Sequence, residues 1–155
     1  GDQRLGEAIG GTRADGKALR RKFYDRNPAF RKLIEEIQRK AKEEGKLIGL
    51  DGRPLYPRSE HSALNLWIQN AAVTVAKRAT LFHFFFMEIN GIQHVEDFTL
   101  AAHVHDEWQI EILEDHADDA AELALDAIKA AGEFYELKVQ LDGETKVGDT
   151  WADTH

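Results

Sequence analysis

Residues 98–111, FTLAAHVHDEWQIE, contain the pattern from which the fold can be predicted. Apolar side chains alternate with polar or small ones on both sides of an acidic pair, as in two strands that each have one buried face. The first strand would place His103 and His105 together on the face opposite Val104. We therefore expect a hairpin with Asp106 and Glu107 at its tip.

The acidic pair admits three interpretations. Adjacent carboxylates repel each other and lose hydration at an apolar tip, and Mg²⁺, which prefers oxygen ligands, would relieve that repulsion. A solvated turn without a ligand explains the same dipeptide. The third interpretation is the metal site of a hydrolase, with His103, His105 and Asp106 as ligands.

Length and composition limit the classes of protein that fit. A chain of 155 residues is long enough for one domain with a sizeable core. The chain has no cysteine, so disulfide frameworks and thiolate metal sites are excluded. Its longest apolar run is far shorter than a membrane span, and it begins with Gly. We expect a processed chain or a piece of something longer, with no membrane partner.

The charge is distributed unevenly along the chain. Residues 1–60 contain 15 Lys and Arg against 10 Asp and Glu, a balance of +5, whereas residues 61–155 contain 5 against 18, a balance of −13. The two balances make up the net charge of −8. A basic front half suits contact with a polyanion, although uneven surface charge explains the same numbers.

Apolar periodicity and end signals predict the remaining elements. We expect helices at residues 3–9, 16–25, 28–44, 60–87 and 115–131. Asn27 would cap the third of these helices, and Gly45 would end it. A small hairpin is expected at residues 46–56, with Asp51 and Gly52 in a type I′ turn, and a further strand at residues 136–141.

The long helix expected at residues 60–87 carries a polar stripe. His61, Asn65 and Gln69 recur at intervals of four residues, so they share one side of a mostly apolar helix. Buried amides are costly without partners. The stripe either bonds to neighbouring backbone or presents hydrogen-bond donors to a ligand beside the helix.

Several ordered segments together resemble one family. The segments HVHDEWQIE and RSEHSALNLWIQNAA, the opening GDQRLGEAIGG and the tail pattern G-x-x-W-x-x-x-H are similar to the C-terminal part of family A (Pol I-like) DNA polymerases, on the phage replicative branch. That part comprises the end of the fingers and the palm. The resemblance implies an α/β (α+β) palm fragment in which an antiparallel His-Asp-Glu hairpin packs with long helices.

The resemblance also implies roles for individual residues. Asp106 matches the palm aspartate that ligates two Mg²⁺ ions, and Glu107 matches the acid that supports it. His105 matches a residue near the primer terminus, and His155 matches a C-terminal histidine close to the active site. The positions that match residues facing the DNA duplex are Arg58, His61, Asn65 and Gln69.

Parts of the family pattern are absent from these 155 residues. They are the Lys and Tyr of the fingers helix and the second palm aspartate with its strand. The resemblance implies residues 1–45 as the end of the fingers and residues 46–155 as the palm. It further implies primer–template DNA and deoxynucleoside triphosphates as partners, an N-terminal polymerase fragment without which the chain is inactive, and the cytoplasm of a phage-infected or bacterial host cell.

Two features of the sequence have more than one explanation. The basic residues Arg13, Lys17, Arg20, Arg21 and Lys22 would lie towards the fingers, where they either meet template phosphates or form a plain solvated face. Besides a polymerase and a hydrolase, a non-catalytic assembly domain with the same fold explains the pattern.

Overall fold

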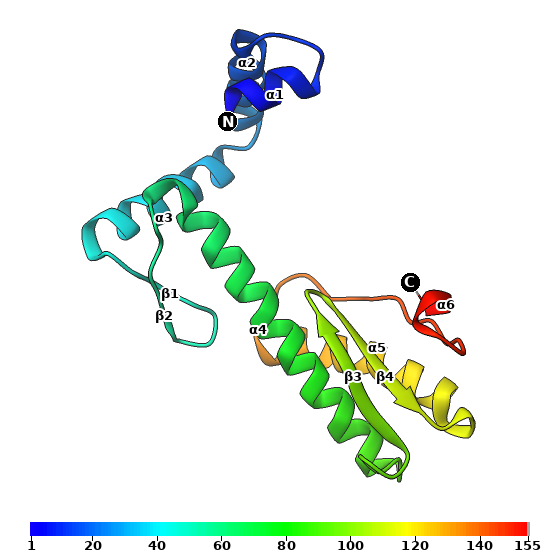
Figure 1. The fold of residues 1–155 in the computed structure, drawn as a ribbon. Helices are drawn as coiled ribbons and strands as arrows, with labels where there is room; N and C mark the ends of the chain where they lie inside the picture. The colour runs from blue at the N-terminus through cyan, green and yellow to red at the C-terminus, as the bar shows by residue number, and fades with distance from the viewer. Residues whose placement is uncertain (155) are drawn as a thin grey trace. The chain divides into compact units, whose positions relative to one another are not determined.

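The computed structural model describes residues 1–154 and shows a mixture of helices and two small antiparallel sheets (Figure 1). The chain divides into two compact units, although its length alone predicts one domain. Unit 1 consists of Gly1–Ile48 and Pro54–Trp67, and unit 2 consists of Gly49–Arg53 and the chain from Ile68 onward. The expected boundary between fingers and palm at residues 45–46 is a functional division and stays a prediction.

Unit 1 begins with two short helices that pack closely. Helix α1 is Asp2–Ala8 and helix α2 is Arg13–Arg26. Thr12 and Asp15 form a capping box, in which the Thr12 Oγ1 accepts from the Asp15 backbone N–H and the Asp15 carboxylate accepts from Thr12. Gly6 and Gly16 let the two backbones approach, because a Cβ on either residue would overlap backbone atoms of the other segment.

Helix α3, Pro28–Glu44, has the predicted start and end but a different cap. The Asn27 side chain makes no cap bond to α3 and instead donates to the Phe23 carbonyl of α2 at 2.8 Å. Pro28 supplies a suitable φ at the first helical position, and Gly45 ends the helix in the left-handed region with φ 68°.

A small core closes unit 1. The strands β1, Leu47–Ile48, and β2, Pro54–Leu55, pair antiparallel. The Trp67 Nε1–H donates to the Ile48 carbonyl at 2.9 Å and ties the start of α4 to this ribbon. The buried residues of this core are Ile37, Ala41, Leu47 and Ala63.

The loop between β1 and β2 differs from the expected type I′ turn. That turn needs positive φ at both central residues, yet only Gly52, with φ 80°, is positive, and Asp51 is not. The Gly52 N–H donates to the Gly49 carbonyl at 3.0 Å, and the Gly49 N–H donates to the Arg53 carbonyl at 2.8 Å. The loop therefore spans residues 49–53 and has its left-handed glycine after the turn.

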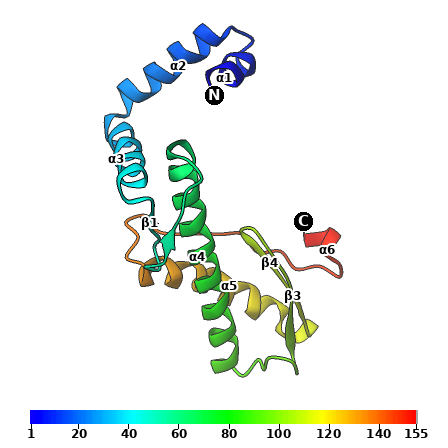
Figure 2. The same cartoon turned by 60° about the vertical axis from the view of Figure 1, so that its left-hand side comes forward.

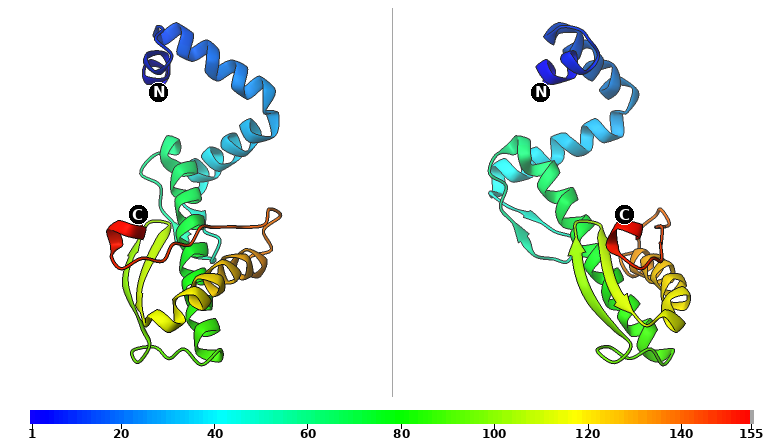
Figure 3. Two further views of the ribbon diagram at one scale, coloured as in Figure 1. Left: turned by 90° about the vertical axis from the view of Figure 1, so that its right-hand side faces the viewer. Right: turned by 45° about the vertical axis from the view of Figure 1, so that its right-hand side comes forward.

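Helix α4, Glu60–Ile89, is the longest element and continues from unit 1 into unit 2. In unit 2, Figures 2 and 3 show its second half beside the hairpin of β3, Phe98–Val104, and β4, Glu107–Ile112, and beside α5, Ala117–Phe134. A second core joins these elements through Met87, Ile92, Phe98 and Ala120, which are all buried.

The described chain after β4, up to residue 154, contains helices and no strand. A 3₁₀ turn η1, Glu114–His116, precedes α5, and α6, Trp151–Thr154, ends the described chain. The strand predicted at residues 136–141 is wrong, since this segment has no strand pairing. Glu136 adopts φ 52°, and Leu141 packs against Gly132 of α5. The segment is therefore irregular chain that lies against α5.

None of the helices in residues 1–154 combines the length and apolar composition that a membrane crossing requires.

Candidate functional site

The predicted hairpin forms, but a bulge changes the faces of its first strand. The pairing runs Leu100 with Ile110 and then Ala102 with Gln109, so Ala101 is an extra residue on β3. Beyond this bulge His103 pairs with Trp108, and their rings lie 6.2 Å apart. His103 therefore shares the face of Trp108. The strict alternation expected from the sequence is wrong after residue 100.

The turn at the hairpin tip consists of His105 and Asp106. His105 has φ 56°, a left-handed conformation that costs a non-glycine residue roughly 1 kcal/mol. Glu107 is already the first residue of β4 and pairs with Val104. The acidic pair is thus split between the turn and the strand, and the exposed Asp106 side chain lies at the tip.

The Asp106 carboxylate makes no hydrogen bond or ion pair with residues 1–154, so none of these residues competes with a ligand for its oxygens. Glu107 is different, because it is half-buried and its Oε1 accepts from the Gln109 side-chain amide at 2.6 Å. The two acids therefore have distinct environments, one open to a ligand and one held by its neighbour.

The tail of the chain contacts the same strand. The Thr154 hydroxyl donates to the Gln109 Oε1 at 3.2 Å, so Gln109 links Glu107 to α6. Asp153 holds the start of this short helix by accepting from the Thr150 N–H at 2.9 Å. The expected role of His155 falls outside the described residues. Gln109 and Thr154 were not predicted as site residues, because they lie at positions of the two matched segments to which the resemblance assigns no role.

A buried histidine anchors the strand that follows the acidic pair. The Trp108 Nε1–H donates to the His83 Nδ1 at 3.1 Å. Indole can only donate, so His83 Nδ1 is the acceptor and its Nε2–H donates to the Ala120 carbonyl at 2.9 Å. One ring thus joins α4, β4 and α5. No motif or spacing singles out His83, which lies within an apolar run.

Burial determines the protonation state of His83. The residue is 1% exposed, and desolvation lowers the pKa of its imidazole from the ordinary 6.5, against a smaller upward effect of the bond to the Ala120 carbonyl. The neutral tautomer that the two hydrogen bonds require is therefore also the favoured charge state at neutral pH.

The polar stripe of α4 is exposed. His61, Asn65 and Gln69 all lie in α4, and Arg58 lies just before it. All four side chains are exposed, so the expected cost of burying amides in this helix does not arise. Asn65 and Gln69 make no side-chain hydrogen bond to residues 1–154, and their donors are available to a ligand.

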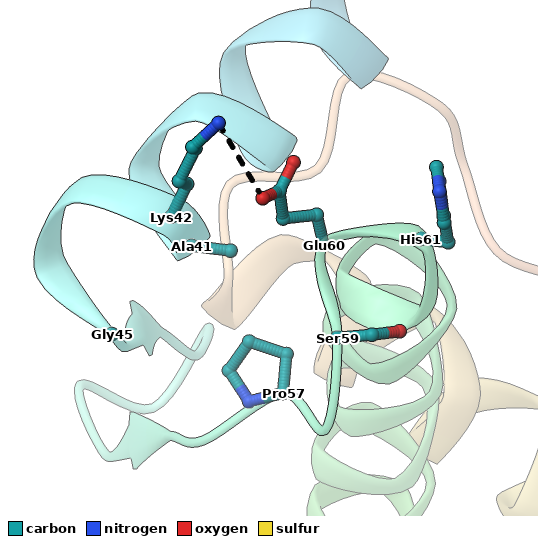
Figure 4. A pocket seen from close by; sticks show the side chains of 7 residues that line it. All are labelled: Ala41, Lys42, Gly45, Pro57, Ser59, Glu60 and His61. Atoms are coloured by element: carbon teal, nitrogen blue, oxygen red, sulfur yellow. Dashed lines mark ion pairs between the residues drawn. The ribbon is translucent and has the colours of Figure 1, made fainter.

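An open pocket of about 450 Å³ lies beside the first turn of α4 in unit 1. Figure 4 shows Lys42 of α3 reaching the Glu60 carboxylate, an ion pair of 3.8 Å, with His61 on the next position of the helix. The pocket holds both a cation and an anion that already pair with each other. His61 therefore lies in a polar pocket in which neither positive nor negative charge dominates.

The hydrolase interpretation is not supported by the arrangement of its ligands. Among the described residues, no group of three or more His, Asp or Glu side chains is placed to hold a metal ion. His103 shares the face of Trp108, whereas Asp106 lies in the turn. His105 also lies in the turn, beyond the end of β3, so it does not share a strand face with His103 as that interpretation required.

Comparison with known proteins gives one consistent family. A family model described as DNA polymerase family A matches residues 1–153. The chain is 31% identical over 172 aligned residues to the DNA-directed DNA polymerases of Enterobacteria phage T3 and of Escherichia phage T7. These alignments cover 100% of this chain and 24% of each phage protein, so the chain spans about a quarter of their length.

A solved structure has the same fold. It is the POL domain of Pol1 from M. smegmatis in complex with DNA primer-template and dNTP, with a TM-score of 0.72 at 20% sequence identity. The match covers 84% of this chain and 24% of that one.

Proposed function

The chain belongs to DNA polymerase family A, and on this premise we propose that it carries one catalytic carboxylate, Asp106, of a DNA-directed DNA polymerase. The observation that carries the proposal is the free Asp106 side chain on a tight turn of a hairpin that Trp108 and His83 anchor. An exposed aspartate that makes no bond with residues 1–154 suits a ligand that arrives with the substrate. The phage relatives have the corresponding activity in their names.

Mg²⁺ fits the donors that the hairpin offers. This ion is usually bound by one or two carboxylates, together with waters and substrate phosphates. Asp106 supplies exposed oxygens, and Glu107 stands next to it with one oxygen already held by Gln109. Asp106 would hold two ions and Glu107 would support the site. When bound, the ions would activate the primer 3′-hydroxyl and stabilise the leaving pyrophosphate.

The exposed polar residues of α4 fit a role in holding the primer–template duplex. The minor groove presents acceptors at similar places whatever the base pair, so amide donors can contact it without reading sequence. Asn65 and Gln69 have free donors for such contacts. Arg58 and His61 would face the sugar–phosphate backbone, and His105 would lie near the primer terminus.

The proposed site needs residues that lie outside these 155 positions. A two-metal site has two aspartates in the family pattern, and the chain offers one of them. The rest of the polymerase, on the same polypeptide or on a separate one, would supply the second aspartate and the fingers helix that contacts the deoxynucleoside triphosphate. The enzyme would act in the cytoplasm of a phage-infected or bacterial host cell.

Primer extension tests this proposal. The 155-residue chain is assayed with Mg²⁺, primed template and deoxynucleoside triphosphates, alone and with the N-terminal remainder of a related phage polymerase. We expect incorporation in the mixture and none with either part alone. A mixture that assembles on primed DNA yet incorporates nothing would argue for a non-catalytic assembly domain instead.

A further inference from the structure

Strand β4 carries two polar side chains beside the hairpin turn. Successive side chains of a strand point to opposite faces, so Glu107 and Gln109 share one face of β4 and Trp108 lies on the other. The Trp108 face meets α4 through His83. The face of Glu107 and Gln109 meets α6 instead, through the bond between Gln109 and Thr154. The C-terminal helix therefore lies against the face of β4 that carries the second acid.

The side-chain amide of Gln109 has one orientation that satisfies both of its neighbours. Its Nε2–H donates to the Glu107 Oε1 at 2.6 Å, and its Oε1 accepts from the Thr154 hydroxyl at 3.2 Å. An ionised carboxylate can only accept, so the NH₂ group must face Glu107 and the carbonyl oxygen must face Thr154. A flipped amide would bring two acceptors together at Glu107. The amide is thus oriented from both ends.

The start of α6 is fixed by its own hydrogen bonds. The Thr150 N–H and hydroxyl both donate to the Asp153 carboxylate, at 2.9 and 2.6 Å, and the Asp153 N–H donates to the Thr150 carbonyl at 3.0 Å. Thr154 follows directly and is half-buried. Its hydroxyl also lies 3.1 Å from the Trp151 carbonyl, so it shares its proton between that carbonyl and Gln109. A contact across 45 positions thus ties α6 to β4.

We propose that Gln109 is a positioning residue, which holds the Glu107 carboxylate beside Asp106 and is itself oriented by Thr154. The inference rests on the proposed function, because it assigns Gln109 to the same metal site. The bond of 2.6 Å is short, as hydrogen bonds to an ionised acceptor are. Carboxylates at metal sites depend on such partners, and losing one typically costs about 10–100-fold in metal affinity or activity.

Packing alone is the competing explanation for Gln109, which is half-buried. Gln109→Leu keeps a similar volume without the amide, and Thr154→Val keeps the shape of threonine without the hydroxyl. If Gln109 only fills space, both variants should behave like the wild type. If it positions Glu107, both should change how the site responds to metal. Circular dichroism verifies that the variants fold.

The Mg²⁺ dependence of single-turnover primer extension, with the chain joined to the N-terminal remainder of a related phage polymerase, tests the proposal. Gln109→Leu should raise the Mg²⁺ concentration for half-maximal rate about tenfold or more and leave binding of primed DNA unchanged. Thr154→Val should raise it less, since its hydroxyl acts through Gln109, and Thr154→Ser should restore the wild-type value. The matched control is Gln140→Leu, at an exposed glutamine of unit 2.

The Gln109 side-chain amide gives a second readout that needs neither metal nor DNA. In the ¹⁵N-labelled chain of 155 residues, NMR measures the exchange of side-chain amide protons with water. The Gln109 protons should exchange more slowly than those of the exposed Gln140. Thr154→Val should speed the exchange at Gln109 and leave Gln140 unchanged.

A double-mutant cycle shows whether Gln109 acts through the Glu107 carboxylate. In the background of Glu107→Leu, the further change Gln109→Leu should have little additional effect on the Mg²⁺ dependence, because the group that it positions is already gone. An additive loss would mean that Gln109 acts elsewhere.

Three outcomes overturn the proposal: a wild-type Mg²⁺ dependence in Gln109→Leu, an equal shift in Gln140→Leu, and equally fast amide exchange at Gln109 and Gln140 in the wild type. Asp106→Asn separates this proposal from the proposed function. An inactive Asp106→Asn with a wild-type Mg²⁺ dependence in Gln109→Leu removes only the role of Gln109. Full activity of Asp106→Asn removes the catalytic assignment itself.

Discussion

His83 joins three elements through the two nitrogens of one ring. Its Nδ1 accepts from Trp108 and its Nε2–H donates to the Ala120 carbonyl. An imidazolium has no acceptor, so protonation would break the bond to Trp108 and leave a charge in the core. The residue that anchors the hairpin is thus also sensitive to pH.

The free energy of unfolding should depend on pH through His83. Burial lowers its folded pKa below the ordinary 6.5, so the unfolded chain binds more protons between the two values. The stabilisation contributed by neutral His83 is therefore fully present above pH 6.5, and it is lost as the pH falls towards the pKa of His83 in the folded chain. Urea unfolding of the wild type and His83→Gln at pH 7.5 and 5.5 measures it.

Glutamine is the matched replacement, because its side chain can accept from Trp108 and donate to Ala120 without titrating. We expect His83→Gln to lose less stability than the wild type when the pH is lowered. An equal loss in both proteins would show that His83 does not carry the pH dependence.

Two buried threonines of α4 differ in whether their hydroxyl groups have a hydrogen-bond partner. Thr74 is 6% exposed and its hydroxyl has no partner in the described residues, whereas the Thr80 hydroxyl donates to the Ala76 carbonyl at 3.0 Å. A buried hydroxyl without a partner costs about 1–3 kcal/mol. Thr74→Val should therefore leave the free energy of unfolding unchanged or raise it by about 1 kcal/mol. Thr80→Val should not raise the free energy of unfolding. Thermal unfolding ranks the two, and a lower midpoint for Thr74→Val than for Thr80→Val would contradict the expectation.

The hairpin turn is the element with the clearest local strain. His105 adopts a left-handed conformation in which glycine has no steric cost. His105→Gly should raise the free energy of unfolding by about 0.5–1 kcal/mol, as measured by urea unfolding. Val104→Gly, one position earlier in β3, is the control and should lower it, since glycine weakens a strand. Destabilisation by both variants would mean that the turn is not strained.

The pair α1 and α2 depends on two glycines. A methyl group on Gly16 would overlap the Asp2 carbonyl, so Gly16→Ala must separate the helices. We expect a loss of about 1–3 kcal/mol, seen as faster hydrogen exchange in α1 and α2. Gly1→Ala meets nothing within 4 Å and is the control. Unchanged exchange in Gly16→Ala would refute the close packing.

Long periodic elements were predictable from the sequence, and irregular ones were not. Helix α4 and the start and end of α3 follow from apolar spacing, Pro28 and Gly45. The bulge at Ala101 left no signal, because small apolar residues continue the alternation through it. The strand expected at residues 136–141 has suitable composition, but strand formation needs a partner, and none pairs with it among the described residues.

The candidate site was predictable to a similar extent. Asp106 and the exposed stripe of α4 came from motifs that match the family in order and spacing. The anchoring of the hairpin was not predictable, because the bond between Trp108 and His83 joins residues 25 positions apart. Such a contact depends on packing that no local pattern describes.

At the scale of the whole molecule, the chain corresponds to only one part of its longer relatives. It covers 24% of the phage T3 and T7 polymerases. Its charge balance is +5 in residues 1–60 and −13 in residues 61–155. Arg58 lies in the basic part, whereas the other proposed duplex contacts, His61, Asn65 and Gln69, lie in the acidic part together with the proposed metal ligand Asp106.

Single-turnover primer extension with Asp106→Asn tests the central claim most directly. The variant chain is combined with the N-terminal remainder of a related polymerase, and Asp118→Asn, which neutralises an exposed acid of α5, is the control. If Asp106 holds the metal ions, its variant should bind primed DNA normally and incorporate nucleotide about 10²–10³-fold more slowly, the order of effect expected when a group that stabilises transition-state charge is lost. The Asp118→Asn protein should retain the wild-type rate. Incorporation by Asp106→Asn at the rate of that control would contradict the assignment of this carboxylate.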